Sequence, residues 1–92
     1  DLNIPNQYAL YQNYPNPFNP TTSITYNLPA DGLVSLKVFD VLGSEVATLV
    51  NENQKAGAYT IPFFAGDLAS GVYICKITVN NFISSIKMIL MK

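Results

Sequence analysis

The chain has 92 residues, of which 49% are hydrophobic and only 12% are charged, and its net charge is −1. This length predicts a single domain. Its five lysines are scattered over positions 37, 55, 76, 87 and 92, so the sequence lacks the basic stripe needed for nucleic-acid binding, and no apolar run approaches the roughly 18–20 residues of a transmembrane helix.

The first residues, Asp1-Leu2-Asn3, include neither an initiator methionine nor a basic segment. We therefore expect the chain to derive from a longer protein whose signal peptide lies elsewhere. Residues 1–12 are polar with scattered apolar positions, and we expect a leading segment there, ending in a short extended piece near Tyr8 to Tyr11. The domain itself is expected over residues 13–92.

Residues 13–22 alternate three prolines with asparagine, tyrosine and phenylalanine. Each proline fixes its own φ, pushes the preceding residue towards extended geometry and lacks a backbone N–H, so a helix is excluded. Tyr14 and Phe18 add two large aromatic rings. The segment predicts a stiff arm that covers a sheet edge or the open end of a sandwich and is anchored by both rings. Exposed rings that stack on a sugar or a partner are the alternative.

Apolar and polar residues alternate with the period of a β-strand through most of the remaining sequence. Pro62 removes one amide and places its strand at a sheet edge or at a bulge. Asn80-Asn81 reads as a two-residue turn, because asparagine tolerates positive φ. The polar residues 51–57 are expected to form a loop. The predicted strands cover residues 23–28, 33–40, 45–50, 58–64, 72–79 and 82–91.

Six or seven short strands, with a turn signal every eight to twelve residues, predict an all-β fold. The expected architecture is an immunoglobulin-like antiparallel β-sandwich of about seven strands with Greek-key connections, and a small barrel is the alternative. Tyr73 stands two residues before Cys75 and follows the corner Leu68 to Gly71. This spacing predicts a tyrosine corner whose hydroxyl reaches back to upstream backbone. Cys75 is expected to be a buried, inert thiol.

The sequence offers little for catalysis or ligand binding. It has no histidine, the commonest general base at neutral pH, and only one cysteine. Asp31, Asp40 and Asp67 do not cluster as metal ligands do, although a calcium ion at the Asp67 loop is an alternative. We expect no enzymatic activity, no cofactor, no metal and no small-molecule substrate.

The last predicted strand is apolar on both faces and is flanked by Lys87 and Lys92. One interpretation is an ordinary sandwich strand with an exposed end. The other is a strand whose edge is offered to a receptor by β-addition. The pattern alone leaves both interpretations open.

Five elements, in the same order, resemble the C-terminal sorting domains of the type IX secretion system. Single elements are weak, but five in order are specific, and they extend over nearly the whole chain. One departure is that only Lys87 precedes the final apolar run, where members often have two or more basic residues. The five elements are the arm Asn13–Thr22, the hairpin Val38–Val46, the pair Ala56-Gly57, the segment Leu68–Tyr73 and the terminal strand Ile86–Lys92.

The resemblance implies a non-catalytic domain behind a cargo protein, recognised by an outer-membrane translocon and removed by a sorting peptidase at the cell surface. The protein would then be secreted or held at the cell surface. The same patterns resemble the immunoglobulin-like domain of flagellar hook-capping proteins, and a carbohydrate-binding or adhesion module is the third alternative. The residues implied in translocon recognition are Lys87, Met88, Ile89, Leu90, Met91 and Lys92. Those implied as structural motif are Tyr14, Pro15, Pro17, Phe18, Gly43, Gly57, Gly71 and Tyr73.

Overall fold

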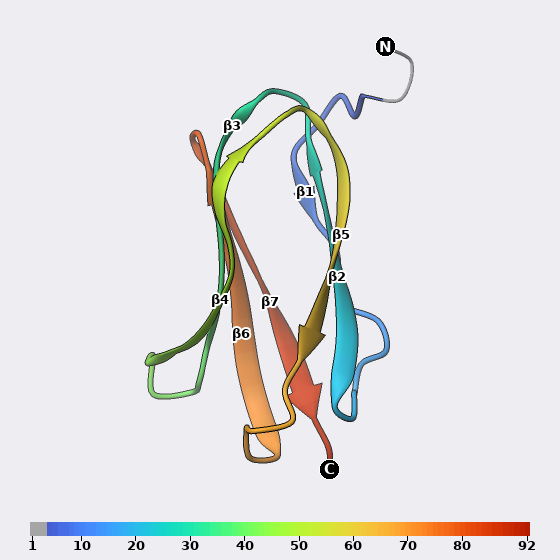
Figure 1. Cartoon of the computed structure of the whole chain (residues 1–92), viewed down its shortest axis with the longest axis vertical. Coiled ribbons are helices and arrows are strands. Elements are labelled where there is room, and N and C mark those ends of the chain that lie inside the picture. The colour runs from blue at the N-terminus through green and yellow to red at the C-terminus, as the bar shows by residue number, and fades with distance from the viewer. Residues whose placement is uncertain (1–3) are drawn as a thin grey trace.

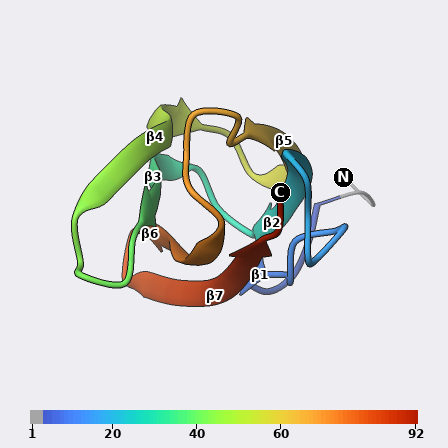
Figure 2. The same ribbon diagram turned by 90° about the horizontal axis from the view of Figure 1, so that it is seen from below.

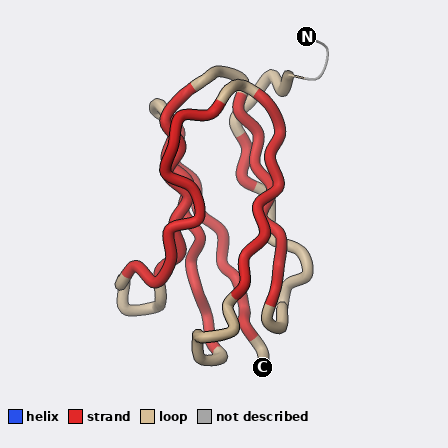
Figure 3. The backbone as a smooth tube through the Cα atoms, viewed as in Figure 1, coloured by secondary structure: helices blue, strands red, loops and turns tan. Residues whose placement is uncertain are grey.

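A computed structural model of the chain describes residues 4–92 and shows seven β-strands (Figures 1 and 3). In this part of the chain no helix is long and apolar enough to cross a membrane. The leading segment expected over residues 1–12 includes residues 1–3, which lie outside the described residues. The strands are β1 (Ala9–Leu10), β2 (Thr21–Leu28), β3 (Gly32–Phe39), β4 (Glu45–Gln54), β5 (Gly57–Phe64), β6 (Gly71–Val79) and β7 (Phe82–Leu90).

The strands form two sheets, with the orders β1-β2-β5 and β4-β3-β6-β7 (Figure 1). All strand pairs are antiparallel, and the chain crosses between the sheets after β2, β4 and β5. The β2-β5 and β3-β6-β7 groups repeat the strand order of an immunoglobulin sandwich, whereas the fourth strand pairs with the third instead of the fifth. The expected all-β sandwich is confirmed.

The largest error in the predicted strands concerns residues 51–54. They were expected in a polar loop, but β4 continues through them to Gln54 and pairs with the start of β3. Polar side chains are compatible with this strand because β4 lies at the sheet edge and Asn51, Glu52 and Asn53 are exposed. β5 is also an edge strand, as Pro62 predicts.

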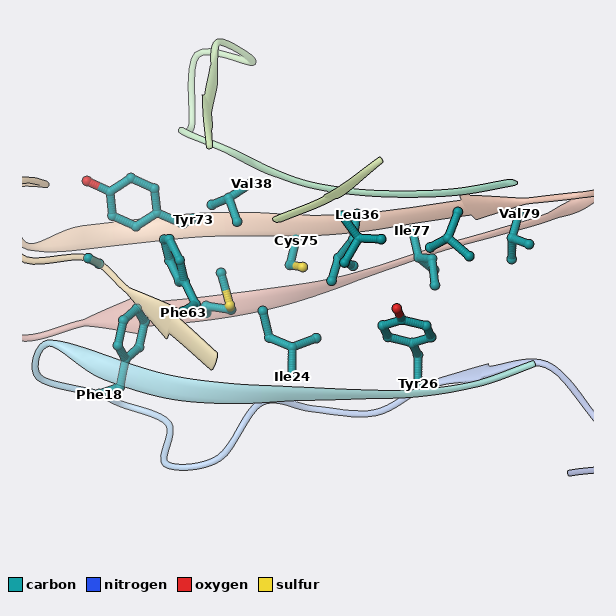
Figure 4. Packing of buried hydrophobic residues seen from close by; sticks show 14 of the residues in the cluster. Phe18, Ile24, Tyr26, Leu36, Val38, Phe63, Tyr73, Cys75, Ile77 and Val79 are labelled. Atoms are coloured by element: carbon teal, nitrogen blue, oxygen red, sulfur yellow. The ribbon is translucent and has the colours of Figure 1, made fainter. Parts of the chain in front are cut away.

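Apolar side chains from both sheets meet in one core (Figure 4). Every second residue of β2, β3 and β6 points inward, as the alternation predicts. One end of the core holds Phe18, Phe63 and Tyr73, and the other end holds Tyr26, whose ring stacks on Tyr59 at 5.4 Å between centroids. The two layers are thus closed by aromatic rings at both ends.

Two turns fix the register of the larger sheet. At the β3–β4 turn, the Asp40 carboxylate accepts hydrogen bonds from the amides of Leu42 and Ser44, both at 3.0 Å. Gly43 has φ +86°, a left-handed conformation that explains why glycine stands there. At the β6–β7 turn, Asn80 has φ +52°, which fits the preference expected for asparagine.

Candidate functional site: the arm and the last strand

The last two residues of the arm predicted over Asn13–Thr22 belong to β2, which begins at Thr21. From here on, the arm means residues 12–20, which lie between the two sheets and are bonded to both. On the side of the smaller sheet, Tyr14 and Ser23 of β2 exchange two backbone hydrogen bonds of 3.0 Å. The carbonyl oxygen of Pro20 accepts the amide of Ala65 at 2.8 Å. Figure 2 shows the arm in blue beside β2 and the end of β7, so the arm closes one side of the sandwich.

On the other side, the arm occupies the outer edge of β7. The amide of Phe18 donates to the Ile89 carbonyl oxygen at 2.9 Å, and the amide of Met91 donates to the Phe18 carbonyl oxygen at 3.0 Å. Side chains complete this edge: Asn16 Oδ1 accepts the Ile89 amide at 2.9 Å, and Gln12 Nε2 donates to the Lys87 carbonyl oxygen at 2.7 Å.

These bonds correct one sequence-based interpretation. An edge used for β-addition must present free amides and carbonyls. Over Lys87 to Met91, four outward backbone groups already bond to the arm: the carbonyl oxygens of Lys87 and Ile89 and the amides of Ile89 and Met91. The interpretation that this edge is free to accept a receptor strand is therefore wrong for Lys87 to Met91 of the folded domain, where a receptor must contact side chains or displace the arm.

A small buried polar cluster ties the arm to β2. Asn13 and Thr22 are 3% and 1% exposed, and Asn13 Nδ2 donates to Thr22 Oγ1 at 3.0 Å. Both side chains also donate to the carbonyl oxygen of Pro15, at 3.2 and 2.8 Å. Buried polar groups are costly unless they are hydrogen-bonded, so this cluster requires asparagine and threonine at these positions. Nothing in the sequence distinguished these two residues from other polar residues of the arm.

The two aromatic rings of the arm differ in environment. Phe18 is 2% exposed and packs beside Phe63, with 6.0 Å between ring centroids. Tyr14 is 82% exposed. The expectation that both rings anchor the arm is therefore wrong for Tyr14, which holds β2 by its backbone alone. Pro15 and Pro17 lie exposed between them.

The six terminal residues implied in recognition divide into two groups. Met88 and Leu90 are 0% and 1% exposed and belong to the core, so no receptor can touch them while the domain is folded. Lys87, Met91 and Lys92 are exposed, and Ile89 is partly buried. The alternation of β7 thus leaves Lys87, Ile89, Met91 and Lys92 as the candidate contact residues.

The structure contains the corner that the sequence predicts at the start of β6. The hydroxyl of Tyr73 donates to the carbonyl oxygen of Ala69 at 2.6 Å, and the ring is 7% exposed. Gly71, which is part of this corner, is the first residue of β6, as Gly57 is of β5. The corner fixes the β5–β6 connection close to the C-terminal end, where the Lys92 amide donates to Ser70 Oγ at 3.0 Å.

The pKa values of two buried side chains and one surface carboxylate are shifted by their surroundings. Burial raises the pKa of the Cys75 thiol to about 12, so little reactive thiolate forms near neutral pH. Burial also raises the pKa of the Tyr26 hydroxyl to about 12, although that hydroxyl donates to Gln54 Oε1. At the surface, hydrogen bonds from Thr48 and Lys37 lower the pKa of Glu45.

Residues 4–92 contain no pocket and no group of three or more side chains arranged to hold a metal ion. In the described residues, the arm and the last strand therefore form a packed surface without a pocket.

The sequence profile of the secretion system C-terminal sorting domain family matches residues 12–92. The chain belongs to this family. The match begins with the arm and runs through β7, so it covers the whole surface described above. A comparison with curated proteins found no match. The relation to hook-capping domains stays a prediction.

Membership gives the role of the domain in outline. It is a C-terminal sorting signal of the type IX secretion system, which implies a cargo protein recognised by that machinery. It also implies export across the outer membrane, to the cell surface or to the medium.

Proposed function

We propose that the folded domain directs an upstream cargo protein through the type IX translocon by side chains at the end of β7. The contact residues are Lys87, Ile89, Met91 and Lys92, and a sorting peptidase then removes the domain at the cell surface. The observation that carries this proposal is the alternation at the end of β7: Met88 and Leu90 point into the core, whereas Lys87, Ile89 and Met91, which alternate with them, point outward.

The arm has a supporting role in this proposal. By bonding to the backbone of Ile89 and Met91, it holds the terminal strand in place at a chain end that would otherwise fray. The receptor then meets one fixed arrangement of side chains, and it does not have to order the segment on binding. Preorganisation of this kind strengthens binding by lowering the entropic cost.

The direct test is export of a reporter cargo fused upstream of the 92 residues, in a host with the translocon. Deleting the terminal residues would remove Met88 and Leu90 from the core and unfold the domain, so substitutions of exposed residues are preferable. The variant Lys87→Ala/Met91→Ser/Lys92→Ala is expected to keep its fold and lose surface delivery. Lys55→Ala, an exposed lysine in the β4–β5 connection, is the control and is expected to export normally.

Normal export of the folded triple variant would contradict the proposal and direct attention to the exposed arm residue Tyr14. Equal loss of export in Lys55→Ala would show a general dependence on charge and no specific contact. Circular dichroism of each variant checks that the sandwich is intact.

We also propose that the domain has no catalytic activity of its own. The chain has no histidine, and its one cysteine is fully buried. Turnover of a glycan, peptide or ester by the purified chain, abolished by a single substitution, would disprove this.

A further inference from the structure

The outer face of the four-stranded sheet carries three of the five lysines of the chain. Lys37 of β3 lies directly opposite Lys76 of β6 in the register, and Lys87 of β7 is one row further along, opposite Ile74. All three point away from the core, because the neighbouring positions in each strand are buried or inward-facing. We call Lys37, Lys76 and Lys87 the lysine face.

Folding does not explain this arrangement. Like charges directly opposite each other on neighbouring strands are destabilising, because their Cβ atoms are only about 4.5–5.5 Å apart. A salt bridge to Glu45 reduces the repulsion at Lys37, with 3.2 Å between Lys37 Nζ and the Glu45 carboxylate. Among residues 4–92 this is the only salt bridge, so Lys76 and Lys87 have no carboxylate partner in the described part of the chain. The sheet bears an electrostatic cost that a bound partner of opposite charge would remove.

The net charge of the lysine face is opposite in sign to the net charge of the whole chain. Three lysines and Glu45 give the face a charge of 3 − 1 = +2, while the chain as a whole carries −1. The remaining charged residues therefore sum to −3. Such separation of charge orients an approaching partner and favours an acidic one.

Apolar side chains lie next to the lysines on the same face. Phe39 pairs with Ile74, which pairs with Lys87, and the next row joins Val72 to Ile89. Val72 is 36% exposed, and the other three are partly buried. Apolar side chains bordered by charged ones are typical of protein–protein interfaces.

From these observations we propose that the lysine face is a docking surface for an acidic protein surface with apolar side chains. A lipid membrane fits less well, because three lysines fall short of the clusters of four to eight that bind anionic lipids. The inference rests on the proposed function and deepens it: the partner's acidic surface extends from the end of β7, which includes Lys87 and Ile89, across β6 to β3.

The first test uses the 92-residue chain, labelled with ¹⁵N, and a synthetic poly-glutamate peptide of about 20 residues as the probe. Shift changes are expected on the outer faces of β3, β6 and β7 and should vanish at high salt. The variant Lys37→Gln/Lys76→Gln should bind about 2- to 30-fold more weakly, since each exposed charge pair is worth about 0.2–1 kcal/mol. Lys55→Glu changes the net charge by the same two units elsewhere and should bind as the parent chain does.

Shift changes centred on another surface, or equal weakening in Lys55→Glu, would overturn the proposal. Co-sedimentation with phosphatidylglycerol vesicles that requires Lys37 and Lys76, without peptide binding, would overturn it in favour of a lipid surface.

The second test is export of the reporter cargo with the same two variants. Reduced delivery of Lys37→Gln/Lys76→Gln, with normal delivery of Lys55→Glu, is the expected result. If the terminal triple variant blocks export but the double variant does not, the docking proposal for the lysine face is wrong and the proposed function stands. If the unchanged chain delivers no cargo, the proposed function itself fails.

Discussion

The two aromatic residues of the arm provide a matched test of the structure, because they stand four residues apart in opposite environments. Phe18 is 2% exposed and packs near Phe63, whereas Tyr14 is 82% exposed. Replacing a buried phenylalanine by alanine costs about 3–5 kcal/mol, from lost burial and the cavity that remains. An exposed substitution away from special features changes stability by no more than about 0.5 kcal/mol.

Phe18→Ala therefore removes a large part of the roughly 5–15 kcal/mol that stabilises a typical domain. In a chain of this size, each kcal/mol shifts Tm by about 4–8 °C, so Tm should fall by at least about 12 °C. Tyr14→Ala should shift it by less than about 4 °C, because its backbone bonds to Ser23 remain. Thermal unfolding followed by far-ultraviolet circular dichroism measures the Tm of both variants.

Comparing the two variants separates the burial of Phe18 from a general sensitivity of the arm to substitution. If Tyr14→Ala destabilises the domain as much as Phe18→Ala, the burial assigned to the two rings is wrong. If neither substitution has an effect, the arm does not contribute to the core, and its bonds to β7 do not form in solution.

Three further predictions concern single side chains. Tyr73→Phe removes the corner hydrogen bond and should lower the free energy of unfolding by about 0.5–1.5 kcal/mol, measured by urea unfolding. Tyr73→Ala also leaves a cavity and should lower it by about 3–5 kcal/mol. Equal, near-zero effects of the two substitutions would show that the corner is absent. Lys76→Thr should stabilise the domain by about 0.2–1 kcal/mol at low salt by removing the charge opposite Lys37, and an unchanged or lower Tm would contradict the register. Because burial raises the pKa of Tyr26 from 10.0 to about 12, its contribution to stability is complete below pH 10 and is lost as pH rises towards 12. Unfolding of Tyr26→Phe should accordingly depend less steeply on pH over this window than unfolding of the parent chain.

Most of the strand pattern could be predicted from local sequence. Alternation placed Ile24, Tyr26 and Leu28 on one face of β2, and they are fully buried. Pro62 restricted β5 to a sheet edge or a bulge, and the edge is what the structure has; the spacing of Tyr73 and Cys75 predicted the corner. Each of these follows from local backbone chemistry or from a period of two, which a short window of sequence contains.

Local patterns failed where the outcome depended on a distant partner. The polar residues 51–54 look like a loop, yet they extend β4 because the start of β3 supplies backbone partners. Tyr14 and Phe18 look equivalent in sequence, and only the position of the arm between β2 and β7 sends one ring outward and the other into the core.

The candidate site shows the same division. Its residues could be named from the sequence, because the terminal strand is a recognisable motif. The packing of distant segments was needed to show that the arm bonds to β7 from Lys87 to Met91, and that Lys37 and Lys76 lie side by side on the face that also holds Lys87. The reason is the register between β3 and β6: it places Lys37 opposite Lys76, 39 positions later, and nothing in the residues between them records that pairing.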